Sequence, residues 1–225
     1  MDLSRKKELF DRFAQNLTSQ RREKIEKNAL QRTRYVTVVL EDIFQAHNTS
    51  AALRSCDCFG VQDVHIIEQK HKFNVHESVA KGAAQWLTLK RYNQQEVNNT
   101  ALCFEALKKD GYKIVATTPH KNDLLISELP LTQKVALVFG TEQEGLSQYA
   151  LEHADLFAKI PMYGFTESFN ISVSVAICLY ETIERLRCSQ IPWQLSEEEI
   201  LDLQLTWLSK TTGYAQEIAA SGSLI

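Results

Sequence analysis

The chain has 225 residues, of which 44% are hydrophobic and 24% are charged, and its formal net charge is −3. This composition is typical of a globular protein with a sizeable core, and the length suits one α/β domain with extensions. No apolar run reaches the 18 residues of a membrane span, and the first ten residues lack the apolar stretch of a signal peptide. We therefore expect a cytoplasmic protein with no membrane partner.

The cysteines argue against a metal site. There are five of them, an odd number, and they are scattered along the chain. Cys56 and Cys58 stand close together, but no second Cys/His pair follows at zinc spacing. Buried thiols are the favoured interpretation, and we predict no metal.

The charge is unevenly distributed. Residues 1–34 hold ten Lys/Arg and five acidic residues, a net charge of +5, whereas the rest of the chain is at −8. A basic arm on an acidic body can contact phosphates, although a solvated amphipathic helix explains the same pattern equally well. The arginines of this arm that we consider for RNA binding are Arg5, Arg12, Arg21, Arg22, Arg32 and Arg34.

Two helices, over residues 3–16 and 19–30, are predicted to precede a β-branched strand at 35–40. A helix at 49–59 follows, with Asn48 as its N-cap and Gly60 at its C-terminal end. Arg54 interrupts the apolar and small residues of this helix. Such a charge is expensive unless it points into a polar site, forms a salt bridge or reaches solvent, and the pattern leaves these alternatives open.

The alternation of strands and helices continues to residue 187. Further strands are predicted at 64–67, 86–92, 113–117, 135–139 and 156–160, and further helices at 99–110 and from about 168 or 170 to 187. This alternation predicts an α/β fold, with a mostly parallel sheet and helices on both faces. Ligands bind such sheets at the carboxyl ends of the strands, where three polar loops stand at 117–119, 140–145 and 161–170. No glycine pattern typical of dinucleotide or P-loop sites is present.

The segment 158–181 is ambiguous on its own. Its Ile-Ser-Val-Ser-Val stretch at 171–175 alternates with period two, as a strand would, whereas the following apolar residues have helical spacing. We interpret it as one helix after a polar loop. The loop can be a ligand cradle or the ordinary start of a capped helix. Beyond it, Ser196 and Glu199 form a capping box that predicts a last helix at 197–210.

Three motifs, taken together, resemble the SPOUT class of RNA 2′-O-methyltransferases. The first is Asn48-x5-Arg54 followed by Phe59-Gly60, and the second is Phe139-Gly140-x-Glu142-x2-Gly145-Leu146-Ser147. The third is Ile160-Pro161-Met162 leading to Glu167-Ser168-x-Asn170-x-Ser172-Val173-Ser174. Each motif is weak alone, but all three in this order over about 150 residues make a specific signal.

The resemblance implies a six-stranded, mainly parallel sheet whose C-terminal part is tied in a deep trefoil knot, at about residues 115–187. We expect this domain at residues 35–190, between a basic helical extension at 1–34 that contacts RNA and a C-terminal helical tail at 191–225.

The resemblance also implies the cofactor, S-adenosyl-L-methionine, and the site residues. The positions that match the cofactor-lining residues of the class are Thr117, Gly140, Ile160, Met162 and Phe169. The catalytic set would be Arg54, Asn48, Glu142, Ser168 and Asn170. Because a guanidinium stays protonated, we expect Arg54 to hold and polarise the ribose and its phosphate, with Asn48 orienting it.

The basic helical arm and the C-terminal helix around one such domain are similar to the TrmH-type tRNA (guanosine-2′-O-)-methyltransferases. This likeness implies a homodimer that methylates tRNA, with guanosine 18 of the D-loop as the target. Methylation of rRNA or of a wobble nucleotide is the alternative, as is a non-catalytic RNA-binding protein of the same fold.

Overall fold

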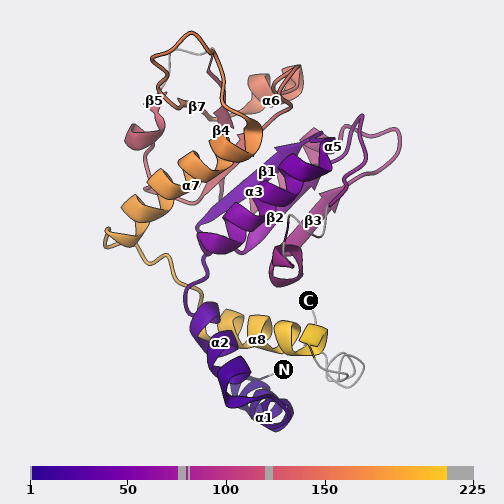
Figure 1. Ribbon diagram of the computed structural model, residues 1–225, viewed down its shortest axis with the longest axis vertical. Helices are drawn as coiled ribbons and strands as arrows, with labels where there is room; N and C mark the ends of the chain where they lie inside the picture. Colours follow the sequence, from indigo (N-terminus) through magenta and orange to yellow (C-terminus); the bar gives the residue numbers. More distant parts are fainter. Residues whose placement is uncertain (1, 76–79, 81, 120–123, 212–225) are drawn as a thin grey trace. The chain divides into compact units, whose positions relative to one another are not determined.

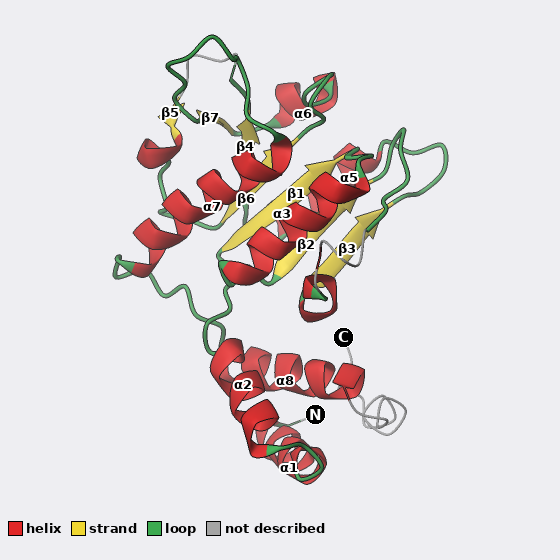
Figure 2. Ribbon diagram, in the orientation of Figure 1, coloured by secondary structure: helices red, strands yellow, loops and turns green. Residues whose placement is uncertain are grey.

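The computed structural model describes residues 2–75, 80, 82–119 and 124–211. The chain divides into two compact units, one of residues 34–193 and one that joins residues 1–33 to residues 194–225. The first is an α/β unit and the second is helical (Figures 1 and 2).

The α/β unit is built on one sheet of seven strands in the order β3-β2-β1-β6-β4-β7-β5, and every neighbouring pair is parallel. The predicted parallel α/β fold is therefore confirmed, with seven strands where six were expected. The additional two-residue strand is too short to show a period. The strands are β1 (Val36–Glu41), β2 (Asp63–Ile67), β3 (Thr88–Tyr92), β4 (Lys113–Thr117), β5 (Leu124–Leu125), β6 (Val135–Phe139) and β7 (Leu156–Lys159).

Helices cover both faces of this sheet. Val38 of β1 belongs to the core cluster that contains side chains of α3 (Ala46–Cys58) and α7 (Ile171–Arg187). Its neighbour Val39 belongs to the opposite cluster, with α5 (Asn99–Lys109) and α6 (Gln148–His153). Every residue of β1 and of β6 is buried, as expected of central strands covered on both faces. Figure 1 shows α3 and α7 side by side in front of the strands, and the two helices are in contact. Two short 3₁₀ turns, η1 (Ala83–Trp86) and η2 (Ile126–Glu128), also belong to this unit.

The start of α7 settles the ambiguous period-two segment as a helix. Asn170 is the N-cap, and its side chain accepts a hydrogen bond from Ser172 N at 2.9 Å. Ile171, Val175 and Cys178 are buried along one face of α7. The strand alternative is therefore wrong for this segment.

The start of α3 differs from the prediction. The helix begins at Ala46, with Gln45 as an N-cap that makes no side-chain cap bond. Asn48 thus lies inside the helix, and its predicted role as N-cap is wrong. The physical reason is that its side chain bonds to residues far along the chain.

The helical unit contains α1 (Leu3–Ala14), α2 (Ser19–Ala29) and α8 (Glu197–Thr211). The apolar faces of α1 and α2 pack on α8, which buries Phe13 and Trp207. Lys6 of α1, itself buried, pairs with Glu198 and Asp202 of α8 at 2.9 and 2.7 Å. The predicted capping box is confirmed, because Ser196 N donates to Glu199 Oε2 and Glu199 N to Ser196 Oγ. The predicted tail is described only as far as residue 211.

An antiparallel bridge between Thr33 and Gln194 pairs the two chain segments at the edge of the helical unit. Among the described helices, none is long and apolar enough to cross a membrane.

Candidate active site

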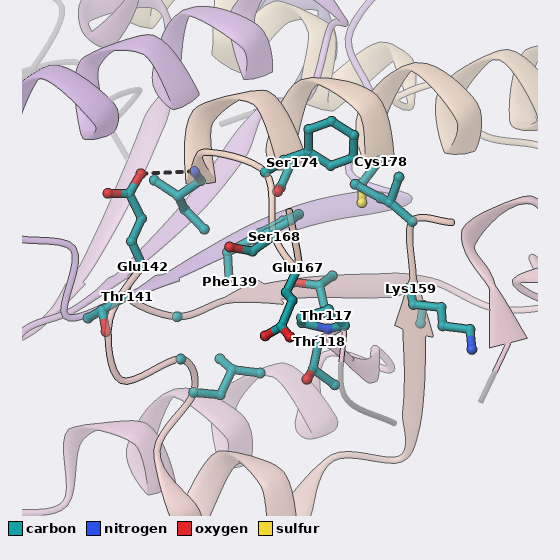
Figure 3. Close-up of a pocket in the computed structure, with 18 of the residues that line it drawn as sticks. Thr117, Thr118, Phe139, Thr141, Glu142, Lys159, Glu167, Ser168, Ser174 and Cys178 are labelled. Carbon is teal, nitrogen blue, oxygen red and sulfur yellow. Dashed lines mark hydrogen bonds between the residues drawn. The ribbon is translucent and has the colours of Figure 1, made fainter. Parts of the chain in front are cut away.

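A pocket of about 360 Å³ opens at the carboxyl ends of β4, β6 and β7. Its walls are the three polar loops that the sequence placed at strand ends, and one face of α7 closes it. Figure 3 shows Ser174 and Cys178 on the side of α7 that faces the pocket, with Glu167 pointing in toward Thr117 and Thr118. Parallel strands bring their carboxyl ends to one edge, which is why segments more than forty residues apart meet here.

All five residues predicted to hold a cofactor line this pocket. They come from β4 or from the loops after β6 and β7, and they are Thr117, Gly140, Ile160, Met162 and Phe169. The Thr117 hydroxyl donates to Val138 O at 2.7 Å, which fixes the end of β4 against β6. Phe169 is 41% exposed and contributes an apolar ring to the wall.

The loop after β6 is tight enough to require a glycine at 140. A Cβ there would lie 2.2 Å from Gly145 O, closer than real Cβ contacts come. Thr141 and Gly145 exchange two backbone hydrogen bonds, at 2.9 and 3.1 Å, and close the loop on itself. Gly145 has φ of +69°, in the region that favours glycine. We name residues 140–147 the glycine loop.

Glu142, at the tip of the glycine loop, joins the first and third motifs. Its Oε1 accepts hydrogen bonds from Asn170 Nδ2 at 2.6 Å, Asn48 Nδ2 at 3.1 Å and Ile171 N at 3.3 Å, the last drawn in Figure 3. Asn170 Nδ2 also donates to Asn48 Oδ1 at 3.1 Å. The carboxylate therefore ties the glycine loop to the inside of α3 and to the N-terminus of α7, where a negative charge is favourable.

Three of the five predicted catalytic residues thus form one network, and the other two lie elsewhere. Ser168 lines the pocket, whereas Arg54 is exposed on α3. Within the part of the chain that the structure describes, Arg54 has no hydrogen bond or ion pair, and Asn48 bonds Gln45 rather than Arg54. The solvent-exposed position explains how a charge is accommodated on this helix.

Two ionisable groups at the site have identifiable surroundings. Burial raises the pKa of Cys178 to about 12, so this thiol stays protonated at neutral pH and is not a nucleophile. Lys70 forms an ion pair with Glu144 of the glycine loop, and this pair lowers the pKa of the exposed Glu144 carboxyl. The described residues contain no group of three or more His, Cys, Asp or Glu that could hold a metal ion.

Thr118, Glu167 and Ser174 also line the pocket, although the sequence analysis assigned them no role there. Thr118 belongs to the polar loop at 117–119, and Glu167 and Ser174 belong to the third motif, so only the direction of these side chains was missing. Ser174 lies three residues after the helix start, and the spacing of α7 identifies it once that start is known.

The predicted RNA-binding arginines fall into different surroundings. Arg5 pairs with Glu8, and Arg22 with both Asp11 and Glu26. Arg32 is buried, with its guanidinium 5.1 Å from the centre of the Trp207 ring.

Arg34 belongs to the α/β unit, where its Nε donates to the buried Asp63 at 3.1 Å. Arg12 is exposed beside Phe13, and Arg21 is half-buried on α2.

This pocket and its network can be compared with those of known proteins. Residues 35–180 match the model of the SpoU rRNA methylase family. A tRNA (guanosine(18)-2′-O)-methyltransferase of Borreliella burgdorferi is 44% identical over 191 residues, which cover 85% of each chain.

Two solved structures have a similar fold. The first is the TrmH/SpoU tRNA-modifying enzyme of A. aeolicus, with a TM-score of 0.75 and 29% identity over 86% of this chain and 97% of that one. The second is the SpoU methyltransferase AviRb of Streptomyces viridochromogenes in complex with AdoMet. It has a TM-score of 0.56 and 21% identity over 71% of this chain and 60% of that one, which shows the fold alone.

The family match spans the whole sheet together with the three pocket loops, and the relative from Borreliella burgdorferi matches across most of both chains. The chain therefore belongs to the SpoU rRNA methylase family.

Proposed function

We propose that this protein transfers a methyl group from S-adenosyl-L-methionine to the ribose 2′-hydroxyl of guanosine 18 in tRNA. One observation carries the proposal: three loops distant in sequence enclose a single pocket, and Glu142 bonds Asn48 and Asn170 beside it. The 44% identical relative, named for this reaction, supports the choice of tRNA and of guanosine 18.

The pocket residues fit the cofactor. A volume of about 360 Å³ lies in the range of small-molecule sites, and the lining combines backbone groups of the glycine loop with apolar side chains such as Leu146 and Met162. Thr117, Gly140, Ile160, Met162 and Phe169 would hold S-adenosyl-L-methionine. When bound, it supplies an electrophilic methyl group on a sulfonium centre.

The chain itself supplies position rather than a strong base. A displacement of this kind requires the attacking oxygen to be held in line, and orientation of reactants can lower a barrier by several kcal/mol. Ser168 and Asn170 would bind the target nucleotide, and Glu142 keeps Asn170 in place. Arg54 would hold the ribose and its phosphate, and phosphate or water would take the proton.

Arg54 is not among the residues that line the pocket of its own chain, which supports a homodimer in which it serves the partner's site. Large apolar side chains stand exposed on the pocket loop and on α7, as an interface requires: Tyr163, Phe165, Phe169, Val173 and Tyr180. We therefore infer that two copies associate through α7 and the loop before it. Tyr180→Glu should yield monomers in light scattering, and a monomeric wild-type protein would contradict the dimer.

The knot is also proposed. Arg185 of α7 donates to the carbonyls of Ile126 and Leu129, at 3.2 and 2.8 Å, so α7 lies directly against the chain between β5 and β6. A knot would form if the segment that ends in α7 passed through the loop made by the chain between β5 and β6. Single-molecule stretching from residues 110 and 190 should stop short of the contour length of an open chain, and reaching the full length would exclude the knot.

For RNA, we propose that the exposed face of α1 and α2 contacts tRNA phosphates through Arg5, Arg12, Arg21 and Arg22. Arg32 and Arg34 have a structural role instead, because Arg32 stacks on Trp207 and Arg34 bonds Asp63. A cytoplasmic location is expected as well, supported by the five free cysteines.

The experiment is methylation of a tRNA transcript by the purified protein, followed by mass-spectrometric mapping of 2′-O-methyl groups. We expect a single modified guanosine at position 18 and none when that guanosine is replaced by adenosine. Arg54→Ala should abolish transfer and leave cofactor affinity unchanged. Modification of an rRNA fragment or of the wobble nucleotide instead would overturn the substrate, and absence of S-adenosyl-L-methionine binding would indicate a non-catalytic protein.

A further inference from the structure

The carboxylate of Glu41 is buried at the carboxyl end of β1, with 3% of the residue exposed. Its Oε1 accepts hydrogen bonds from Thr100 Oγ1 at 2.6 Å and from Ser147 Oγ at 2.8 Å. Its Oε2 accepts a third from Ser147 N at 2.8 Å. A buried carboxylate is costly unless such donors surround it, and here both oxygens are bonded.

Two of these three bonds go to Ser147, the last residue of the glycine loop. Ser147 is also the N-cap of α6, where its hydroxyl accepts from Ala150 N at 3.1 Å. Because Glu41 accepts both the N–H and the hydroxyl proton of Ser147, it fixes this residue in position and in orientation.

The glycine loop is consequently held at two places by two carboxylates. Glu142 ties the tip to α3 and α7, and Glu41 ties the end to β1 and α5. Gly145 and Leu146 lie between these anchors, and both line the pocket. Apart from the N-cap bond between Ser147 and Ala150, the described side-chain hydrogen bonds of residues 145–147 all go to Glu41.

We propose that Glu41 is a positioning residue for the cofactor pocket, acting through Ser147 on the wall formed by Gly145 and Leu146. This inference rests on the proposed function, since it takes the pocket to hold S-adenosyl-L-methionine. Glu41 itself lines a neighbouring cavity and does not touch this pocket.

The test is Glu41→Gln, which keeps the size of the side chain but replaces one acceptor oxygen by a donor. The hydroxyls of Thr100 and Ser147 can turn to accept from this donor, but every bond then loses the assistance of the negative charge, and the hold on Gly145 and Leu146 weakens. We expect the Kd for S-adenosyl-L-methionine, measured by calorimetry, to rise about tenfold, as loss of one charge-assisted hydrogen bond implies. The KM for tRNA should change less than twofold.

Glu68→Gln is the matched control. The Glu68 side chain is also largely buried just after the neighbouring strand β2, and its oxygens accept from Phe73 N and from Arg91. Its bonds do not involve the glycine loop. We expect a similar loss of stability in urea with an unchanged Kd. An equal rise of Kd in both variants, or a Kd within twofold of wild type in Glu41→Gln, would overturn the inference.

A second set of variants keeps the test decisive if Glu41→Gln fails to fold. Ser147→Thr retains the hydroxyl that bonds Glu41, so it should keep more cofactor affinity than Ser147→Ala does. Thr100→Val removes a bond to α5 only and should weaken binding less than Ser147→Ala. The reverse order would refute the role of Ser147. Wild-type protein that binds no cofactor would instead refute the proposed function.

Discussion

Replacing Gly140 by alanine tests the shape of the glycine loop separately from its chemistry, because a methyl group adds neither charge nor a hydrogen bond. The new Cβ would lie 2.2 and 2.3 Å from O and C of Gly145 and 2.5 Å from Leu146 N. All three are backbone atoms, so no side chain can rotate out of the way. Gly140 has no positive φ, and the effect is therefore purely steric.

The size of the effect follows from the contacts. An ordinary contact begins near 3.4 Å, so Gly145 must move by roughly 1 Å. Such a shift breaks the two backbone bonds between Thr141 and Gly145, at about 1 kcal/mol each. Restoring the loop to bind the cofactor then costs about 2 kcal/mol, or roughly a thirtyfold rise in Kd.

The assay is calorimetric titration of S-adenosyl-L-methionine into each variant. Gly164→Ala is the matched control in the pocket loop at 161–170, since a Cβ there would meet nothing within 4 Å. Gly145→Ala adds no clash either but forces an alanine to φ of +69°, at a cost of about 1 kcal/mol. We expect Gly140→Ala to bind most weakly and Gly164→Ala as well as wild type. A Kd for Gly140→Ala within twofold of wild type would refute this reasoning.

Three further predictions concern other parts of the chain. Burial lowers the pKa of His65 to about 4, and the nearby Lys90 contributes to this shift. As the pH falls, His65 therefore becomes protonated near pH 6.5 in the unfolded chain but only near pH 4 in the folded one. Its neutral form therefore favours folding fully above pH 6.5, and up to about 3 kcal/mol is lost as the pH falls to 4. Urea unfolding of His65→Gln should be less pH-dependent than wild type across this window, and equal slopes would contradict the prediction. Lys6→Met leaves the largely buried Asp202 without its cation, and thermal unfolding should show a loss of about 1–3 kcal/mol with no change in cofactor affinity. Finally, the exposed Lys24 and Lys27 of α2 are candidates for phosphate contacts. Replacing both by glutamine should reduce the slope of log affinity for tRNA against log salt concentration by about 2. An unchanged slope would show that these two residues of α2 do not contact the tRNA.

Where the sequence was sufficient, one local signal dominated. The strands Lys113–Thr117 and Val135–Phe139 were predicted with their observed bounds, because buried parallel strands are continuous apolar runs between turn residues. The position of the three pocket loops was predicted because each follows a predicted strand, and parallel strands bring their carboxyl ends to one edge of the sheet.

Where the sequence was insufficient, the missing information was tertiary. Asn48 has the chemistry of an N-cap, and only the approach of Glu142, 94 residues later, explains why it sits within the helix. The two-residue strand Leu124–Leu125 exists because β7 pairs with it. Glu41 gives no local signal at all, since a single acidic residue at a strand end resembles an ordinary surface charge.

The bridge between Thr33 and Gln194 has a consequence for the order in which the protein assembles. The α/β unit is one continuous segment of about 160 residues inserted into the helical unit, whose two halves it separates. At typical synthesis rates, α1 and α2 leave the ribosome roughly 10–30 s before α8 exists to cover their apolar faces. During that interval Phe10 and Phe13, which are buried in the folded protein, are exposed to water or bound by a chaperone. The helices α1 and α2 are thus synthesised first, but the helical unit can be completed only after α8 has been synthesised.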